Sequence, residues 1–89
     1  MIRRELTLVN RLGLHARAAS KLVQTASQWD SEVFVEFNER RVNAKSIMGV
    51  LLLAAPCGSE LILEVDGPDE AQVADALEAL VKERFGEPE

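Results

Sequence analysis

The sequence has very few of the side chains that build metal centres or disulfide frameworks. Its 89 residues include one cysteine, Cys57, and one histidine, His15. One thiol cannot form an internal disulfide, and one thiol with one imidazole is too small a ligand set for structural zinc. Cys57 lies in Pro56-Cys57-Gly58-Ser59, a turn composition, and we interpret it as an incidental thiol. We therefore expect neither a metal nor a cofactor.

Long apolar runs are also absent. The longest, Val50 to Cys57, is far shorter than the roughly 20 residues that a membrane-spanning helix needs. The chain opens with Met1-Ile2-Arg3-Arg4-Glu5 and continues in alternation, without the apolar region of a signal peptide. We therefore expect a cytoplasmic protein that does not insert into a membrane.

Aromatic residues are scarce, and no dense basic patch is present. One Trp and three Phe are the only aromatic residues, and the formal net charge is −5. These features argue against nucleic acid as a partner, because phosphate backbones need dense positive charge. The charge is uneven, however. Residues 1–45 carry eight basic and five acidic groups, whereas residues 46–89 carry two basic and ten acidic groups. The first half is therefore suited to binding a small anion.

The overall composition predicts one small globular domain over residues 1–89. Apolar residues make up 47 % and charged residues 28 % of the chain, which is ordinary globular usage. The scaling of surface with mass predicts that a chain of this size buries about 60–65 % of its surface. Only Gly-Pro pairs and the last few residues have the composition of disordered segments.

Apolar periodicity predicts an α+β protein with helices on one side of an antiparallel sheet. The predicted elements are strands at 2–8, 33–37, 40–44 and 60–66, and helices at 16–29, 47–53 and from about 68 to 84. The hairpin turn Asn38-Glu39 lacks the glycine that would make it a strong signal. Ser46 favours a helix for 47–53 as its N-cap, although a buried strand also fits this apolar run.

The segment Gly13-Leu14-His15-Ala16-Arg17 lies where the first strand ends and the first helix begins. The first turn of a helix leaves backbone N–H groups unpaired, and with the helix dipole they attract anions. Gly13 permits an unusual turn, and the Arg17 guanidinium suits phosphate oxygens. A neutral imidazole is a competent nucleophile toward an activated phosphoryl group. The segment therefore suits phosphoryl transfer to His15, although a helix cap with a nearby surface charge would have the same spacing.

Two blocks of the sequence carry a resemblance to a known family. Gly13-Leu14-His15-Ala16-Arg17-Ala18-Ala19 resembles the phosphohistidine signature of HPr, the histidine-containing phosphocarriers of the phosphoenolpyruvate-dependent sugar phosphotransferase system. Asn43-Ala44-Lys45-Ser46-Ile47-Met48-Gly49-Val50 resembles the regulatory-serine segment of the same family. The spacing of the blocks, the chain length and the order of elements match as well, so the resemblance covers nearly the whole chain.

The resemblance implies an open-faced βαββαβα sandwich with helices on one face of a four-stranded antiparallel sheet. His15 would accept a phosphoryl group on Nδ1 from the phosphohistidine of enzyme I and pass it to a histidine of an enzyme IIA protein or domain. Arg17 and the backbone amides of Ala16 and Arg17 would hold the phosphate. The protein would be a monomeric carrier with a covalent phosphohistidine intermediate, not an independent turnover enzyme.

The second block implies regulation and docking. Ser46 would be phosphorylated by an HPr kinase/phosphorylase, which would add about two negative charges at the start of a helix. The residues implied to dock partners are Ala16, Arg17 and Ser20 from the first helix, with Ile47, Met48 and Leu51. The alternative, that apolar residues of this run are core, is strongest for Leu52 and Leu53.

The sequence departs from many relatives at two positions. Ala18 stands where many have proline after the arginine, and Leu12 stands where many have a small polar residue before the glycine. Two alternatives lie within the same family type: a regulatory relative that acts mainly through Ser46, against which the presence of His15 and Arg17 counts, and a nitrogen-type phosphorelay. A small α+β enzyme such as an acyl-phosphate hydrolase is the alternative from another class.

Overall fold

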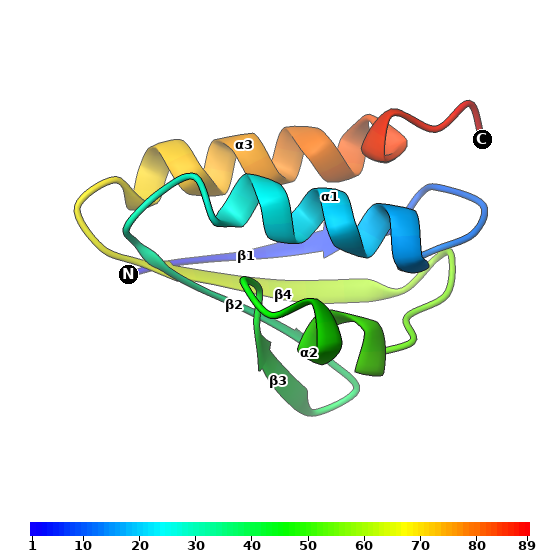
Figure 1. Cartoon of the computed structure of the whole chain (residues 1–89), viewed down its shortest axis with the longest axis horizontal. Coiled ribbons are helices and arrows are strands. Elements are labelled where there is room, and N and C mark those ends of the chain that lie inside the picture. The colour runs from blue at the N-terminus through cyan, green and yellow to red at the C-terminus, as the bar shows by residue number, and fades with distance from the viewer.

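Four strands and three helices follow one another along the chain in the computed structural model, which describes residues 1–89 (Figure 1). In chain order they are β1 (Ile2–Thr7), α1 (Ala16–Ala26), β2 (Glu32–Phe37), β3 (Arg40–Asn43), α2 (Ile47–Leu52), β4 (Glu60–Asp66), α3 (Glu70–Lys82) and the short 3-10 turn η1 (Arg84–Gly86). This order confirms the predicted βαββαβα arrangement. No helix is both long enough and apolar enough to cross a membrane.

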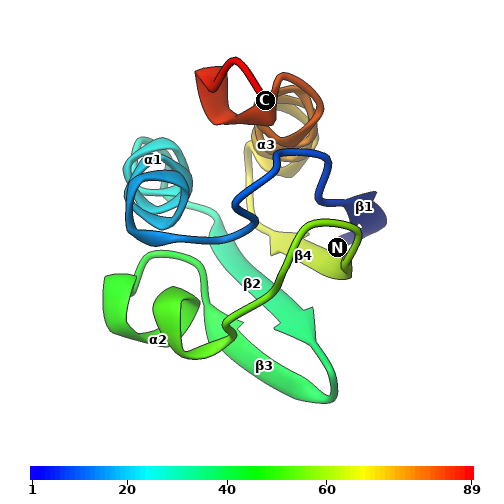
Figure 2. The same ribbon diagram turned by 90° about the vertical axis from the view of Figure 1, so that its right-hand side faces the viewer.

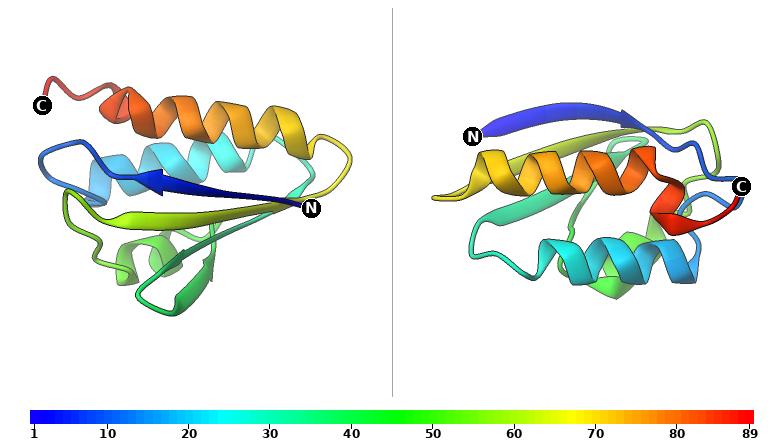
Figure 3. Two further views of the ribbon diagram at one scale, coloured as in Figure 1. Left: turned by 180° about the vertical axis from the view of Figure 1, so that it is seen from behind. Right: turned by 90° about the horizontal axis from the view of Figure 1, so that it is seen from above.

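The strands form one antiparallel sheet in the order β1-β4-β2-β3. In the register, Leu6 lies opposite Leu61, and Val35 lies opposite both Leu63 and Val42. The three helices all lie on the same face of this sheet, with α1 and α3 side by side and α2 beside β3 (Figures 2 and 3). The other face is open, so the fold is the predicted open-faced α+β sandwich.

The core lies between the sheet and the helices and contains 21 buried hydrophobic residues. The strands supply the apolar half of their alternation, such as Leu61, Leu63 and Val65 of β4. Helix α1 buries mainly small side chains, including three alanines, which lets its backbone approach its neighbours closely. It ends at Ala26 and not at Trp29, because Trp29 turns back against the core and its carbonyl accepts a bond from Lys45 Nζ at 2.7 Å.

Two local predictions are decided by backbone geometry. Residues 47–53 form a helix and not a strand, and Ser46 Oγ accepts a hydrogen bond from the Gly49 amide at 3.2 Å as its N-cap. The β2–β3 hairpin closes without glycine, because Asn38 (φ 54°) and Glu39 (φ 68°) both adopt left-handed conformations. Positive φ at both central positions matches the twist of the strands, and asparagine tolerates it well.

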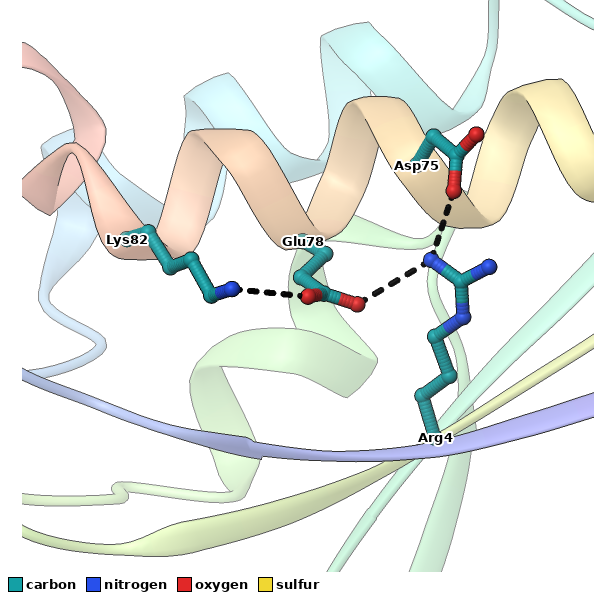
Figure 4. Close-up of polar contacts among 4 residues, drawn as sticks. All are labelled: Arg4, Asp75, Glu78 and Lys82. Carbon is teal, nitrogen blue, oxygen red and sulfur yellow. Dashed lines mark hydrogen bonds and ion pairs between the residues drawn. The ribbon is translucent and has the colours of Figure 1, made fainter.

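An ion network ties α3 to the outer strand β1 (Figure 4). Arg4 Nη1 donates to Asp75 Oδ1 at 2.8 Å and to Glu78 Oε1 at 3.0 Å, and Lys82 Nζ lies 2.9 Å from the other oxygen of Glu78. Lys82 and Arg4 together lower the pKa of Glu78. Because Asp75 and Lys82 are largely exposed, each pair contributes little stability. The network orients α3 on a sheet that buried side chains already hold.

The C-terminal segment, residues 84–89, is folded back onto the domain, so the prediction of disorder for the last residues was wrong. Arg84 (φ 57°), Phe85 (φ 55°) and Gly86 (φ 80°) are three successive left-handed residues that reverse the chain after α3. The Phe85 side chain is 0 % exposed, and its carbonyl accepts a hydrogen bond from Lys21 Nζ of α1. The end of the chain then pairs with the loop after β1, where the Arg11 amide donates to the Glu89 carbonyl at 2.9 Å.

Phe85 should be a main source of stability for this C-terminal segment. We expect Phe85→Ala to lower the free energy of unfolding by about 3–5 kcal/mol, because it removes a fully buried ring and leaves a cavity. Urea denaturation measures this loss. Met48→Ala is a control, because Met48 is 67 % exposed and its loss should change stability by about 0.5 kcal/mol or less. A loss at Phe85 no larger than that of the control would contradict the anchoring role.

Candidate functional site

The loop between β1 and α1 is held by a backbone contact that only glycine permits. Gly13 has φ +64°, and a Cβ on it would lie 2.4 Å from the Ala55 carbonyl oxygen. Next to it, the Leu14 amide donates to the same carbonyl at 2.9 Å, and the Leu14 side chain is buried. The turn at Gly13 is thus pressed against the loop before β4, which sets the start of α1.

His15 is the N-cap of α1. Its backbone is extended (φ −78°, ψ −179°), and its carbonyl accepts the first intrahelical bond from the Ala19 amide at 2.8 Å. The imidazole makes no side-chain capping bond, so it does not saturate the amides of the first turn. Ala16 and Arg17 follow directly and are exposed. The structure therefore brings together an imidazole, unpaired amide donors and a guanidinium at the positive end of a helix.

An open pocket of about 510 Å³ surrounds His15. Its walls come from the loop after β1, the first turn of α1 and the C-terminal segment. The lining residues are Arg11, Leu12, His15, Ala16, Arg17, Glu87, Pro88 and Glu89. Arg11 pairs with Glu89 across its rim at 2.8 Å. The imidazole is 28 % exposed, so it can be reached from outside the domain.

Glu87 contributes a buried carboxylate to this pocket, and the sequence analysis missed it. One carboxylate oxygen contacts His15 Nε2, and the other accepts a hydrogen bond from Asn10 Nδ2 at 3.1 Å. The side chain of Glu87 is only 7 % exposed. Burial acts to raise the pKa of Glu87, but the bonds from Asn10 and His15 and the charge of Arg17 lower it overall. No local signal points to Glu87, because only the left-handed turn at Arg84–Gly86 brings it to His15.

The residues for which the sequence predicted regulation and docking lie on α1 and α2 and at the start of α2. Helix α2 packs against α1, and Ser46 is exposed at its start. Ile47 is 39 %, Met48 67 % and Leu51 36 % exposed, whereas Ser20 of α1 is half-buried. Of the two leucines for which a core position was the strongest alternative, Leu53 is buried, but Leu52 is 61 % exposed and extends the apolar surface. Leu12, at 65 %, adds an apolar side chain at the pocket itself.

Fold and pocket together define an open-faced α+β sandwich that presents one imidazole at a helix N-terminus on its surface. The family described as "PTS HPr component phosphorylation site" matches residues 2–83 of the chain. The chain therefore belongs to the HPr family, the phosphocarriers of the phosphotransferase system.

Relatives and solved structures agree with this assignment along the whole chain. "Phosphocarrier protein HPr" of Cupriavidus necator is 55 % identical over 89 residues, and that of Neisseria meningitidis serogroup B is 52 % identical, in both cases with all of each chain covered. The crystal structure of HPr from Thermoanaerobacter tengcongensis superposes with a TM-score of 0.96 at 40 % identity, covering all of both chains. That of Bacillus anthracis has a TM-score of 0.87 at 35 % identity, covering 90 % of this chain and 95 % of the other.

The pKa of Glu87 should respond to the loss of His15. We expect the Glu87 carboxylate in the wild type to titrate below the ordinary value of 4.5, and its pKa to rise in His15→Ala. Because the folded pKa is lowered, ionised Glu87 stabilises the fold fully above its unfolded pKa, and this contribution is lost as pH falls through the folded pKa. Carbon NMR titration of the carboxyl group measures both values. An unchanged titration midpoint in His15→Ala would contradict the contact.

Proposed function

We propose that His15 accepts a phosphoryl group on Nδ1 from the phosphohistidine of enzyme I and passes it to a histidine of an enzyme IIA protein or domain. The observation that supports this most is the partly exposed imidazole in an open pocket, which Arg17 also lines, at the unpaired amides of the first turn of α1. Residues 1–89 would act as one domain, as a monomer in the cytoplasm. The protein is then a carrier with a covalent intermediate and turns over only with its partners.

Phosphoryl transfer to His15 needs little from the protein beyond position and charge. The Nδ1 lone pair forms a bond to phosphorus while the donor's P–N bond breaks and its electron pair returns to the donor imidazole. The oxygens of the transferred group would lie near the Arg17 guanidinium and the amides of Ala16 and Arg17, which offset their negative charge. This hold must be modest, because a carrier that binds its cargo too tightly cannot release it.

Partner docking is proposed for the surface formed by α1 and α2 beside the pocket. Ile47, Met48 and Leu51 expose apolar area there, and Ser20 borders it from α1. Methionine suits a surface that accepts several partners, because its unbranched side chain adapts to different shapes. Arg11 and Arg17 at the pocket favour partners whose docking faces are acidic. The phosphoryl donor and the phosphoryl acceptor would bind this same surface one after the other.

The phosphocarrier role predicts a single labelled residue. With enzyme I and labelled phosphoenolpyruvate, we expect wild-type protein to take up one phosphate that is labile in acid and stable in alkali. His15→Ala should take up none, because the chain has no second imidazole. Ser46→Ala is the matched control and should be labelled as wild type. Labelling of His15→Ala at the wild-type level, or steady release of phosphate without any partner, would contradict the proposal.

Regulation by an HPr kinase/phosphorylase is proposed at Ser46. The hydroxyl is exposed, and its ester oxygen could still accept the Gly49 amide bond after phosphorylation. The added phosphate would carry about two negative charges beside Ile47 and Met48. Such charge on a surface that docks acidic partners would weaken their binding.

A charge at residue 46 should slow transfer without unfolding the protein. We expect Ser46→Asp to raise the apparent KM for transfer from enzyme I about tenfold, equivalent to about 1.4 kcal/mol, because aspartate adds charge but still caps α2. Ser46→Ala should transfer like wild type but lose about 1 kcal/mol of stability with its cap. Steady-state transfer assays and urea denaturation measure the two effects. Equal KM values for the three proteins would argue against regulation by charge at this position.

A further inference from the structure

Glu87 is a buried carboxylate in contact with His15, and the relay proposed above assigns it no part. Its contact is to Nε2, the ring nitrogen that does not take the phosphoryl group. A carboxylate with a lowered pKa is ionised at neutral pH, and an ionised carboxylate can only accept hydrogen bonds. Nε2 must therefore be the donor in this contact. In a neutral imidazole only one nitrogen carries hydrogen, so the lone pair then lies on Nδ1.

Neighbours on several elements hold Glu87 in position. Asn10 is fully buried, and its Nδ2 donates to the Gly13 carbonyl at 2.7 Å as well as to Glu87 at 3.1 Å. Turning the Asn10 amide over would point its oxygen at two acceptors, so this group is a fixed donor. Phe85 is buried two residues before Glu87, and its carbonyl is bonded to Lys21. Glu87 is thus held from the loop, from the core and from α1.

We propose that Glu87 is a positioning residue that holds His15 in the tautomer with hydrogen on Nε2 and so keeps Nδ1 available as the nucleophile. The proposal rests on the phosphocarrier function proposed above. It gives the C-terminal segment a role in the chemistry, although this segment has no part in the signature around His15. Asn10 supports the arrangement by occupying the second carboxylate oxygen.

The contact between Glu87 and Nε2 also suits the change in charge on the imidazole during transfer. As the Nδ1–P bond forms and the donor's P–N bond breaks, the imidazole of His15 becomes cationic while its Nε2–H stays in place. The Glu87 carboxylate faces that hydrogen and offsets the developing positive charge, and no proton has to leave. When the next acceptor attacks phosphorus, the electron pair of the Nδ1–P bond returns to Nδ1. The ring is then again neutral with hydrogen on Nε2.

Glutamine at position 87 tests this role with little change in shape. Because Asn10 donates, the amide oxygen of the glutamine should accept from Asn10, and its NH₂ group should face Nε2. An NH₂ group there donates, which favours hydrogen on Nδ1 and removes the nucleophilic lone pair. Since His15 is the only histidine, its two ring nitrogens can be read without overlap in a long-range proton–nitrogen correlation spectrum of isotope-labelled protein.

We expect the wild-type spectrum, at a pH where the ring is neutral, to show hydrogen on Nε2, and the Glu87→Gln spectrum to show it on Nδ1. Phosphorylation of Glu87→Gln by enzyme I should be about 10- to 100-fold slower, the size of the loss when a hydrogen-bond partner that orients a metal-binding histidine is removed. Glu83→Gln is the matched control: it removes the same charge from an exposed position shortly before Glu87 and should match wild type in both measurements.

The two proposals fail separately. If wild-type protein takes no phosphate from enzyme I, the carrier function fails whatever the tautomer. If it takes phosphate, the role of Glu87 is overturned by a wild-type ring with hydrogen on Nδ1, by a Glu87→Gln ring that keeps hydrogen on Nε2, or by a changed tautomer without a slower rate. The wild-type spectrum decides the first of these alone, so the test does not depend on the folding of the variant.

Discussion

The close approach of Gly13 to the Ala55 carbonyl is the contact on which the site depends. The Leu14 amide bonds to this carbonyl and holds the loop after β1 against the loop before β4, and the absence of a Cβ on Gly13 is what permits so close a contact. The next residue, His15, starts α1. A displacement of the turn would therefore shift the imidazole and the first-turn amides together. The geometry of the pocket therefore depends on where the loop before β4 lies, through the contact at Gly13.

The C-terminal segment completes the pocket from the opposite end of the sequence. Three left-handed residues reverse the chain, and Phe85 anchors it in the core. Glu87 then contacts the imidazole of His15, which follows the turn at Gly13. The acidic second half of the chain and the basic first half thus meet at His15. This explains why the net charge of −5 is a poor guide to the site, where Arg11 and Arg17 face Glu87 and Glu89.

The fold and the location of the imidazole could be predicted from the sequence because both depend on local patterns. Alternation and helical spacing report burial directly, and a glycine and a histidine before a helix place the ring at its N-terminus. The features that the sequence did not predict depend on contacts between residues that are distant along the chain. Gly86 is a typical residue for ending a helix, but Arg84 and Phe85 adopt positive φ without being glycine, so the local sequence did not indicate the reversal that brings Glu87 to His15. Leu52, at 61 % exposed, shows the reverse failure, since an apolar run does not reveal which of its members face solvent.

A small carrier faces a problem that enclosed enzymes avoid. A domain of 89 residues has little material to enclose a reacting group, and a ring that meets successive partners, as proposed for His15, has to stay on the surface. Water then competes for both ring nitrogens, and an exposed imidazole exchanges between its two tautomers. In the role proposed for it, a carboxylate that is itself 7 % exposed and accepts a hydrogen bond from a buried asparagine would hold Nε2 and so keep the ring in one tautomer. With Nε2 bound to Glu87, the proposed nucleophile Nδ1 would have a defined protonation state in a ring that partners can still reach.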